Sequence, residues 1–204
     1  SLYLIAKATL KMKLLSLFSF LVISFSSFSQ ENEETNDHIY WNKTFTLEWS
    51  DFQGSPPDSQ ESAALSNIAI PYGFETYSDG RVTVNINACF IRSKSWVVPK
   101  FKNNLLLQHE QLHFDIAELI RRKIVKALIE ADVTVDNAEA VMKSIMKHYW
   151  AGEYKKMQER YDAESNFSRF ISKQIEWNNE IAAELEKYDS YKYTELTLGL
   201  KDDQ

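Results

Sequence analysis

Hydrophobic and polar residues alternate along much of the first half of the chain. Residues 44–49 place an aromatic or aliphatic side chain at every second position, and this period of two predicts a half-buried strand. Residues 67–77 and 81–91 have the same period, and the Ser-Asp-Gly sequence between them predicts that they pair as a hairpin. The buried face of the second run is expected to hold Val82, Val84, Ile86 and Ala88.

The second half of the chain has the spacing of α-helices. Residues 103–131 contain no Gly or Pro and repeat apolar residues every three or four positions, which predicts one long helix. A second helix is predicted over residues 138–163 with Asp136 as its N-cap, and a third over residues 168–188. The tail at 190–204 contains a Leu-Thr-Leu sequence that is expected to pair as an edge strand. The apolar stripe of the third helix is expected to consist of Phe170, Ile171, Ile175, Ile181 and Leu185.

The order of these elements predicts the class of fold. Strands that come first and helices that follow are typical of α+β proteins. We therefore expect a small antiparallel sheet in the N-terminal half of the chain, followed by three long helices. A chain of 204 residues is long enough for one domain with its own hydrophobic core.

The first 29 residues have the pattern of a secretory signal peptide. A positively charged start is followed at 14–28 by an apolar, Ser-rich run that is too short to span a bilayer comfortably. Small residues then predict cleavage after Ser29. Met12 would be an economical translation start, which would place residues 1–11 upstream of it. The protein is therefore expected to be exported, to the periplasm or to the extracellular space.

Composition restricts the partners of the exported chain. Residues 30–39 are polar and acidic and are expected to form a flexible leader to a single domain over 40–204. The formal net charge is −6, and it becomes −9 once the three Lys of the predicted signal peptide are removed. This acidic balance argues against nucleic acid or an anionic membrane as the partner, and no later segment is apolar enough to span a membrane.

The only Cys, Cys89, is expected to be a buried small hydrophobe. The oligomeric state stays open.

Residues 105–120 read LLLQHEQLHFDIAELI and carry the clearest chemical signal. His109, Glu110 and His113 form an H-E-x-x-H motif. On a helix, residues four apart share one face, so the two imidazoles can bind one metal ion while Glu110 lies beside it. This is the arrangement of a zincin-like active-site helix and predicts Zn²⁺ as the cofactor. Two separate core histidines are the alternative, but each buried ring would then need its own hydrogen-bond partners.

A catalytic zinc site uses a third protein ligand and leaves a position for water. Glu118 follows the first motif histidine by nine residues and so faces the opposite side of the helix, and Asp115 is also turned away. The third ligand must come from another element, and Asp162, near the end of the second helix, is the preferred candidate. Glu164 stays open as an alternative. So does His148, which shares a face with Asp162 to within about 40°, although it lies roughly 20 Å away along the helix.

Further stretches accompany the motif. They are residues 49–54 (WSDFQG) with Pro56 and Pro57, Ser95 with Trp96, residues 109–118, residues 161–165 (YDAES), and Gln174 with Trp177 and Asn178. Together they resemble a bacterial domain-of-unknown-function family described as secreted zinc-dependent (HExxH) proteases, and the resemblance extends over nearly the whole predicted mature chain. In that family the segment after Tyr-Asp commonly reads Glu-Thr-x-His, whereas here Ser165 replaces the Thr and Phe167 the His. If the family His is a ligand, this chain has lost it; if Asp162 is the ligand, nothing essential is missing.

These observations predict an exported zinc-dependent metallohydrolase of the peptidase class. The two motif histidines and Asp162 would hold Zn²⁺, and Glu110 would act as general base toward a zinc-activated water. The substrate would be a peptide or protein, added as a strand to the edge of the hairpin that contains residues 81–91. The alternative is a catalytically inactive envelope binding or scaffold protein that retains the fold, and Phe167 is its main support.

Overall fold

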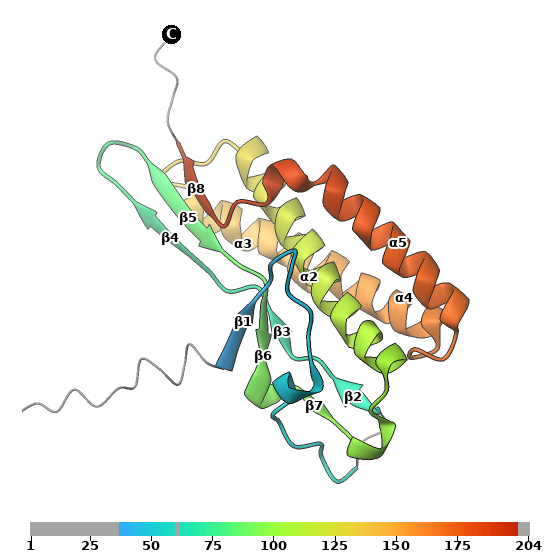
Figure 1. Ribbon diagram of the computed structural model, residues 1–204. Coiled ribbons are helices and arrows are strands. Elements are labelled where there is room, and N and C mark those ends of the chain that lie inside the picture. Colours follow the sequence, from blue (N-terminus) through green and yellow to red (C-terminus); the bar gives the residue numbers. More distant parts are fainter. Residues whose placement is uncertain (1–36, 60–61, 200–204) are drawn as a thin grey trace, which may run out of the picture.

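In the computed structural model, which describes residues 37–59 and 62–199, short strands precede long helices along the chain (Figure 1). The expected α+β class is confirmed. The strands are β1 (His38–Tyr40), β2 (Ala64–Leu65), β3 (Ile68–Ala69), β4 (Tyr72–Thr76), β5 (Val82–Ile86), β6 (Cys89–Ile91), β7 (Trp96–Val97) and β8 (Glu195–Leu198). The α-helices are α2 (Asn104–Glu130), α3 (Ala138–His148), α4 (Lys155–Ser165) and α5 (Ile171–Lys187). The shorter helices are η1 (Trp49–Asp51), η2 (Arg92–Lys94), η3 (Pro99–Phe101), η4 (Tyr149–Tyr154) and η5 (Asp189–Tyr191).

The predicted signal peptide lies outside the described residues, as does most of the predicted leader. β1 begins at His38, within the range that was expected to be a flexible leader, and it pairs with β6. His38 and Ile39, which were expected to belong to the flexible leader, are therefore part of a strand.

A two-stranded antiparallel ribbon organises the strands. β3 pairs with β6 through Ile68 and Phe90, and β4 pairs with β5 in the same register through Tyr72 and Ile86. Pro71 lies at the break between the two halves, where a residue without a backbone N–H is tolerated. β1 adds to β6 and β8 adds to β5, while β2 and β7 form a separate pair, so the strands make three small antiparallel sheets.

The predicted hairpin is confirmed in β4 and β5. The N–H of Tyr77 donates to the carbonyl oxygen of Arg81 at 2.9 Å, and Gly80 adopts a φ of +92°, which glycine tolerates in a tight turn. The four residues expected on its buried face are at most 2% exposed, and the tail pairs through β8 as expected. The edge of this hairpin that was expected to bind a peptide stays a prediction. β5 lies between β4 and β8, and β6 lies between β1 and β3, so the free side of the hairpin belongs to β3 and β4, which each pair on one side only among the described residues.

Residues 44–49 do not form the predicted strand. The expected alternation is present, because Leu47 is buried and Thr46 is exposed. The backbone N–H of Leu47 nevertheless donates to the side-chain Oε1 of Gln111 on α2, at 2.8 Å, and not to a neighbouring strand. A side-chain acceptor thus replaces the strand partner, and a period of two in the sequence cannot distinguish these arrangements.

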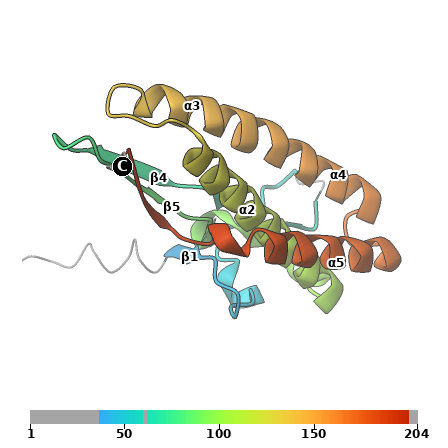
Figure 2. The ribbon, with the colours of Figure 1, turned by 90° about the horizontal axis from the view of Figure 1, so that it is seen from above.

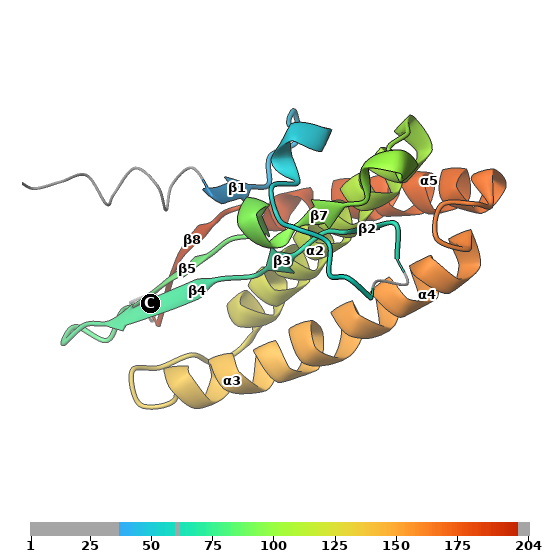
Figure 3. The same ribbon diagram turned by 90° about the horizontal axis from the view of Figure 1, so that it is seen from below.

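Helix α2 lies at the centre of the fold. It runs between α5 on one side and the α3–α4 pair on the other (Figure 2), and β2 and β3 contact it near the metal motif (Figure 3). It begins after Asn103, whose Oδ1 accepts the N–H of Leu106 at 3.0 Å, close to the predicted start. Ile116 and Ile120 are fully buried, and burial of each such side chain contributes about 1.5–3 kcal/mol. No helix of the described residues is long and apolar enough to cross a membrane.

The second predicted helix is divided. A π-helical turn, η4, separates α3 from α4, and Gly152 lies within it. The predicted N-cap, Asp136, was wrong: the N-cap residue is Asn137, and its Oδ1 accepts the N–H of Thr134 at 2.8 Å. A π turn inserts about one extra residue, which rotates the following helix by about 100° relative to an uninterrupted one.

The buried stripe of α5 also differs from the prediction. Ile181 is buried and Leu185 is half-buried, as expected, but Phe170, Ile171 and Ile175 are each more than half exposed. The inward positions of the first turns are Gln174 and Trp177, which are 1% and 2% exposed. The apolar residues of the sequence therefore predicted the wrong buried face for the first turns of α5, where the polar side chain of Gln174 is buried.

Cys89 is buried, as expected of a lone thiol that packs as a small hydrophobe. Its exposed fraction is 2% and it forms no disulfide. Burial, with the negative charge of Asp37 nearby, raises the pKa of its thiol to about 11. The thiol therefore stays protonated and unreactive at neutral pH.

A buried ionic network lies on the side of α2 that faces away from the motif. The carboxylate of Glu118 accepts hydrogen bonds from Arg121 at 2.7 and 2.8 Å and from Arg122 at 2.7 Å, and all three side chains are at most 4% exposed. Arg121 also donates to the carbonyl oxygen of Tyr193 at 2.8 Å, which holds the segment that leads into β8. Glu118, which helix geometry excludes as a metal ligand, belongs to this ionic network.

Replacement of Glu118 by Ala is expected to lower the free energy of unfolding by about 3–5 kcal/mol. The buried guanidinium of Arg121 loses its counter-charge, and that of Arg122 keeps only the longer ion pair with Asp189 at 3.6 Å. The measurement is urea denaturation followed by circular dichroism. Glu130→Ala serves as the control, since it removes only an exposed ion pair with Lys126 and should cost less than about 1 kcal/mol. Equal, small losses in both variants would contradict the assigned role of the network.

Candidate metal centre

Three potential metal ligands converge where α2 meets α4. His109 and His113 project from successive turns of α2, and Asp162 projects from α4. The Asp162 Oδ1 lies 3.0 Å from His109 Nε2 and 3.1 Å from His113 Nε2, and the two Nε2 atoms are 3.1 Å apart. Among the described residues, these three form the group whose donor atoms are close enough to share an ion.

The spacing of these atoms fits a small tetrahedral ion. Bonds of about 2.0–2.1 Å place the ligands of a tetrahedral zinc about 3.3 Å apart, and the triangle has sides of 3.0–3.1 Å. His109 is deeply buried, whereas the side chains of His113 and Asp162 are 14% and 31% exposed. The triangle is therefore accessible to solvent on one side, as a catalytic site with a fourth position for water requires.

The outer nitrogens of both imidazoles are held by glutamines. His109 Nδ1 lies 3.2 Å from the Oε1 of Gln174 on α5, and His113 Nδ1 is hydrogen-bonded to the Oε1 of Gln158 on α4. An amide oxygen only accepts, so each Nδ1 carries the proton in a neutral imidazole. Each Nε2 then presents a lone pair toward the centre of the triangle. Such hydrogen bonds select the tautomer and orient metal-binding histidines.

The orientation of each glutamine is fixed in turn by its other contacts. Gln158 donates its Nε2 to the backbone oxygen of His113 at 3.0 Å. Gln174 donates its Nε2 to Asn178 Oδ1 at 3.1 Å, and its Oε1 accepts the hydroxyl of Tyr161 at 2.7 Å. In both cases the amide nitrogen is used elsewhere, so the amide oxygen faces the imidazole. The tautomers thus follow from a connected network.

The electrostatics of the cluster favour positive charge at its centre. Burial raises the pKa of the Asp162 carboxyl, but hydrogen bonds from His109 and His113 outweigh it and hold that pKa well below its usual range. Burial likewise opposes charge on His113, yet its hydrogen bond to Asp162 and the nearby charge of Glu110 raise its pKa. Both shifts favour a positive charge between these groups. Zinc binding requires neutral imidazoles and an ionised carboxylate, so the affinity for zinc is expected to fall as the pH falls.

Glu110 lies beside the triangle and is 4% exposed. Its Oε2 accepts the hydroxyl of Ser66 at 2.7 Å. Ser66 belongs to the short connection between β2 and β3, which brings this edge of the sheets against α2. The contact fixes the position of the carboxylate next to the two histidines.

The alternative ligands lie elsewhere. Glu164 Oε2 accepts the indole N–H of Trp177 at 2.9 Å, and its Oε1 pairs with Arg160 at 3.3 Å. His148 precedes the π turn and packs its ring against Tyr149. The π turn explains the second case, because it rotates α4 away from the face that the two residues would share on a continuous helix.

Phe167 contributes no donor to the triangle. It is 55% exposed and lies in the turn between α4 and α5, where three successive residues have a positive φ. The three potential ligands that the structure brings together do not include this position, although the resemblance seen in the sequence placed a histidine there.

The sequence did not assign a role to three residues of the site. Gln158 precedes Asp162 by one helical turn, so a polar residue on the ligand face was a usable signal. Gln174 interrupts the apolar stripe of α5 at a buried position, which is a weaker signal. Ser66 lies in an irregular connection, and no periodicity could have placed it against Glu110.

Comparison with known proteins identifies a similarity over the same part of the chain. Residues 95–168 match one family model. It is described as "Bacterial protein of unknown function (DUF922)", and the matched segment contains both motif histidines, Glu110 and Asp162. No curated protein and no solved structure matches the chain. The similarity therefore supports a bacterial family for this segment and assigns it no activity.

Replacement of Asp162 by Ala is expected to lower zinc affinity by at least about tenfold, because the triangle loses its only carboxylate. Calorimetric titration of the metal-free protein with Zn²⁺ measures the effect. Glu164→Gln and His148→Ala are the matched controls and should bind zinc like the wild type. Loss of binding in either control, with retention in Asp162→Ala, would assign the third ligand differently.

Replacement of Gln158 by Leu is expected to weaken zinc binding by about 10–100-fold, because His113 loses the acceptor that selects its tautomer. Glu159→Gln changes the exposed neighbour on the same helix and should leave the affinity unchanged. The same titration compares the two variants, with circular dichroism to check that both are folded. Equal affinities would mean that the glutamine does not support the ligand.

Proposed function

We propose that this chain is an exported zinc-dependent metallohydrolase that cleaves peptide bonds. The observation that carries the proposal is the convergence of three lone pairs, from His109, His113 and Asp162, with the carboxylate of Glu110 beside them. The donor set of two imidazoles and one carboxylate suits Zn²⁺. Export rests on the signal-peptide pattern of the first 29 residues.

Zinc bound by these residues supplies a Lewis acid that lowers the pKa of a water to about 7 and polarises a carbonyl group. Glu110 is placed to accept a proton from the attacking water and to return it to the nitrogen of the leaving amine. Ser66 holds one oxygen of Glu110 through a hydrogen bond of 2.7 Å. The second oxygen is the one assigned to proton transfer.

The proposed substrate is an extended peptide that adds to the β2–β3 edge. β2 pairs only with β7 and β3 only with β6 among the described residues, so each has one side without a strand partner. Ser66, between these two strands, touches Glu110. A peptide paired with this edge would pass beside the carboxylate, and its main-chain hydrogen bonds would give affinity without demanding one sequence.

Glu110→Gln is expected to keep stoichiometric zinc and to lose at least about 100-fold in the rate of peptide cleavage, because the amide cannot accept the proton. Zinc content is measured by mass spectrometry, and cleavage with a quenched fluorescent peptide library. Glu48→Gln changes an exposed glutamate that is distant from Glu110 in the sequence. It controls for losses of zinc or activity during purification and assay. Cleavage by neither wild type nor variant, with zinc bound in both, would favour the inactive binding or scaffold protein. Absence of bound zinc in both would overturn the site itself.

A further inference from the structure

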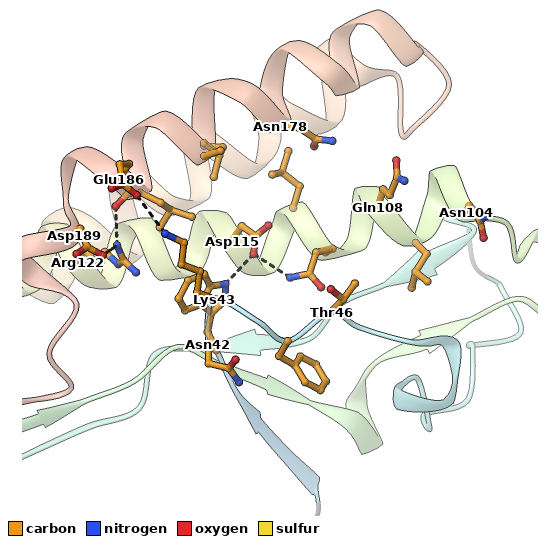
Figure 4. Close-up of a pocket in the computed structure, with 18 residues that line it drawn as sticks. Asn42, Lys43, Thr46, Asn104, Gln108, Asp115, Arg122, Asn178, Glu186 and Asp189 are labelled. Atoms are coloured by element: carbon orange, nitrogen blue, oxygen red, sulfur yellow. Dashed lines mark hydrogen bonds and ion pairs between the residues drawn. The ribbon is translucent and has the colours of Figure 1, made fainter.

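A second site is suggested by a cavity of about 580 Å³ between α2, α5 and residues 41–46 (Figure 4). Its volume lies within the range of roughly 300–1,000 Å³ that is usual for small-molecule sites. On α2 its lining includes Gln108, Gln111 and Asp115. These positions are turned by roughly 100–160° from His109 about the helix axis. The cavity therefore lies on a different face of α2 from the candidate metal centre.

The walls of the cavity combine apolar surface with amide groups. The apolar lining is Trp41, Phe45, Leu107, Leu112, Ile181, Ala182 and Leu185. The neutral polar lining is Asn42, Thr46, Asn104, Gln108, Gln111 and Asn178. Such a surface accommodates an organic body and leaves charge recognition to a few side chains.

Most of the charges around the cavity are already paired. Lys43 forms an ion pair with Glu186 at 3.4 Å, and Arg122 forms one with Asp189 at 3.6 Å, and Figure 4 draws both. Asp115 is the remaining charged residue of the lining, and it has no ion pair with a cationic residue in the described chain. Its partners are two neutral donors.

The carboxylate of Asp115 has capacity for a further partner. Its Oδ1 accepts the indole N–H of Trp41 at 2.8 Å and the side-chain N–H of Gln111 at 3.0 Å. Its Oδ2 accepts no hydrogen bond from the described residues, and Figure 4 shows the carboxylate within the lining. A positive charge at Oδ2 would offset the cost of burying this carboxylate.

We propose that this cavity binds a small organic cation, a protonated primary amine on an aromatic or aliphatic body, with the Asp115 carboxylate as its anchor. The ammonium group donates to Oδ2, while the body packs against Phe45 and the leucines of α2. The charge of the ligand is opposite to that of the one unpaired group in the lining. The site is independent of the metal centre, so its test does not depend on catalysis.

Three indole compounds of similar size and different charge test the assignment by isothermal titration calorimetry. Tryptamine carries the ammonium group, tryptophol is neutral and indole-3-acetate is an anion. Tryptamine is expected to bind the full chain with a Kd of about 1 mM or tighter, as its size allows. Tryptophol should bind at least about tenfold more weakly, and indole-3-acetate should not bind detectably. Nα-acetyl-lysine methylamide, which presents the same ammonium group as a peptide lysine, shows whether a free amine or a lysine side chain is preferred.

Three variants locate the site. Asp115→Asn keeps the shape of the anchor and should weaken tryptamine binding at least about tenfold without changing the affinity for tryptophol. Ala182→Trp places a large side chain in the lining and should abolish binding. Ala183→Trp is its matched control, because Ala183 is exposed on the same helix and outside the cavity lining. The Ala182 and Ala183 variants keep the test decisive even if Asp115→Asn fails to fold.

The binding preferences of the wild type and the variants decide whether Asp115 anchors a cation. Preference for tryptamine over tryptophol that is lost in Asp115→Asn or Ala182→Trp and kept in Ala183→Trp supports the proposal. Equal binding of all three compounds, tighter binding of indole-3-acetate, or no binding of any amine overturns it. Tighter binding of the anion would instead assign the recognition to Lys43 and Arg122. Repetition with EDTA-treated protein should give the same affinities, which distinguishes this site from the metal centre.

Discussion

The hydrogen bonds from the two histidines to Gln158 and Gln174 determine what the metal centre can do. Each glutamine offers an amide oxygen to an imidazole Nδ1, so each Nε2 is left with a lone pair that points at Asp162. Three lone pairs at this spacing repel one another unless a proton or a metal ion lies between them. The hydrogen bonds to the two glutamines therefore support the proposal that this cluster binds a cation.

Helix α2 can carry this cluster because its other faces are stabilised independently. Its aliphatic residues pack into the core, and the buried Glu118 is neutralised by Arg121 and Arg122 on the face away from the motif. Arg121 also holds the segment that leads into β8, so the C-terminal tail is tied to the same helix. The histidines therefore project from a helix that is held by contacts outside the motif, which favours a preorganised site.

The candidate metal centre and the cavity lie on two faces of α2 that both contact α5. Gln174 accepts from His109 on the metal side, and Asn178, one helical turn later, lines the cavity and accepts from Gln174. A polar stripe on α5 thus passes from the metal centre to the cavity. This also explains why the inner face of α5 is not the apolar stripe expected from its sequence. Gln174 occupies the buried position beside His109, while Ile171 and Ile175 lie at the surface.

The sequence by itself determined the class of fold, the long helix, the central hairpin and the two motif histidines. Each depends on local periodicity: a period of two for Val82 to Ala88, and a spacing of four for His109 and His113. Backbone geometry converts such spacing directly into shared faces, so no distant contact is needed to predict them. The exclusion of Glu118 followed from the same geometry.

The tertiary structure alone decided between Asp162, Glu164 and His148 as partners of the motif, because the π turn between α3 and α4 sets which face of α4 meets α2. It also decided that residues 44–49 lie against Gln111 and not in a sheet, and that Ser66 reaches Glu110. These contacts join segments that are far apart in the chain. Their partners are side chains whose positions depend on how the helices pack, and no local pattern encodes that packing.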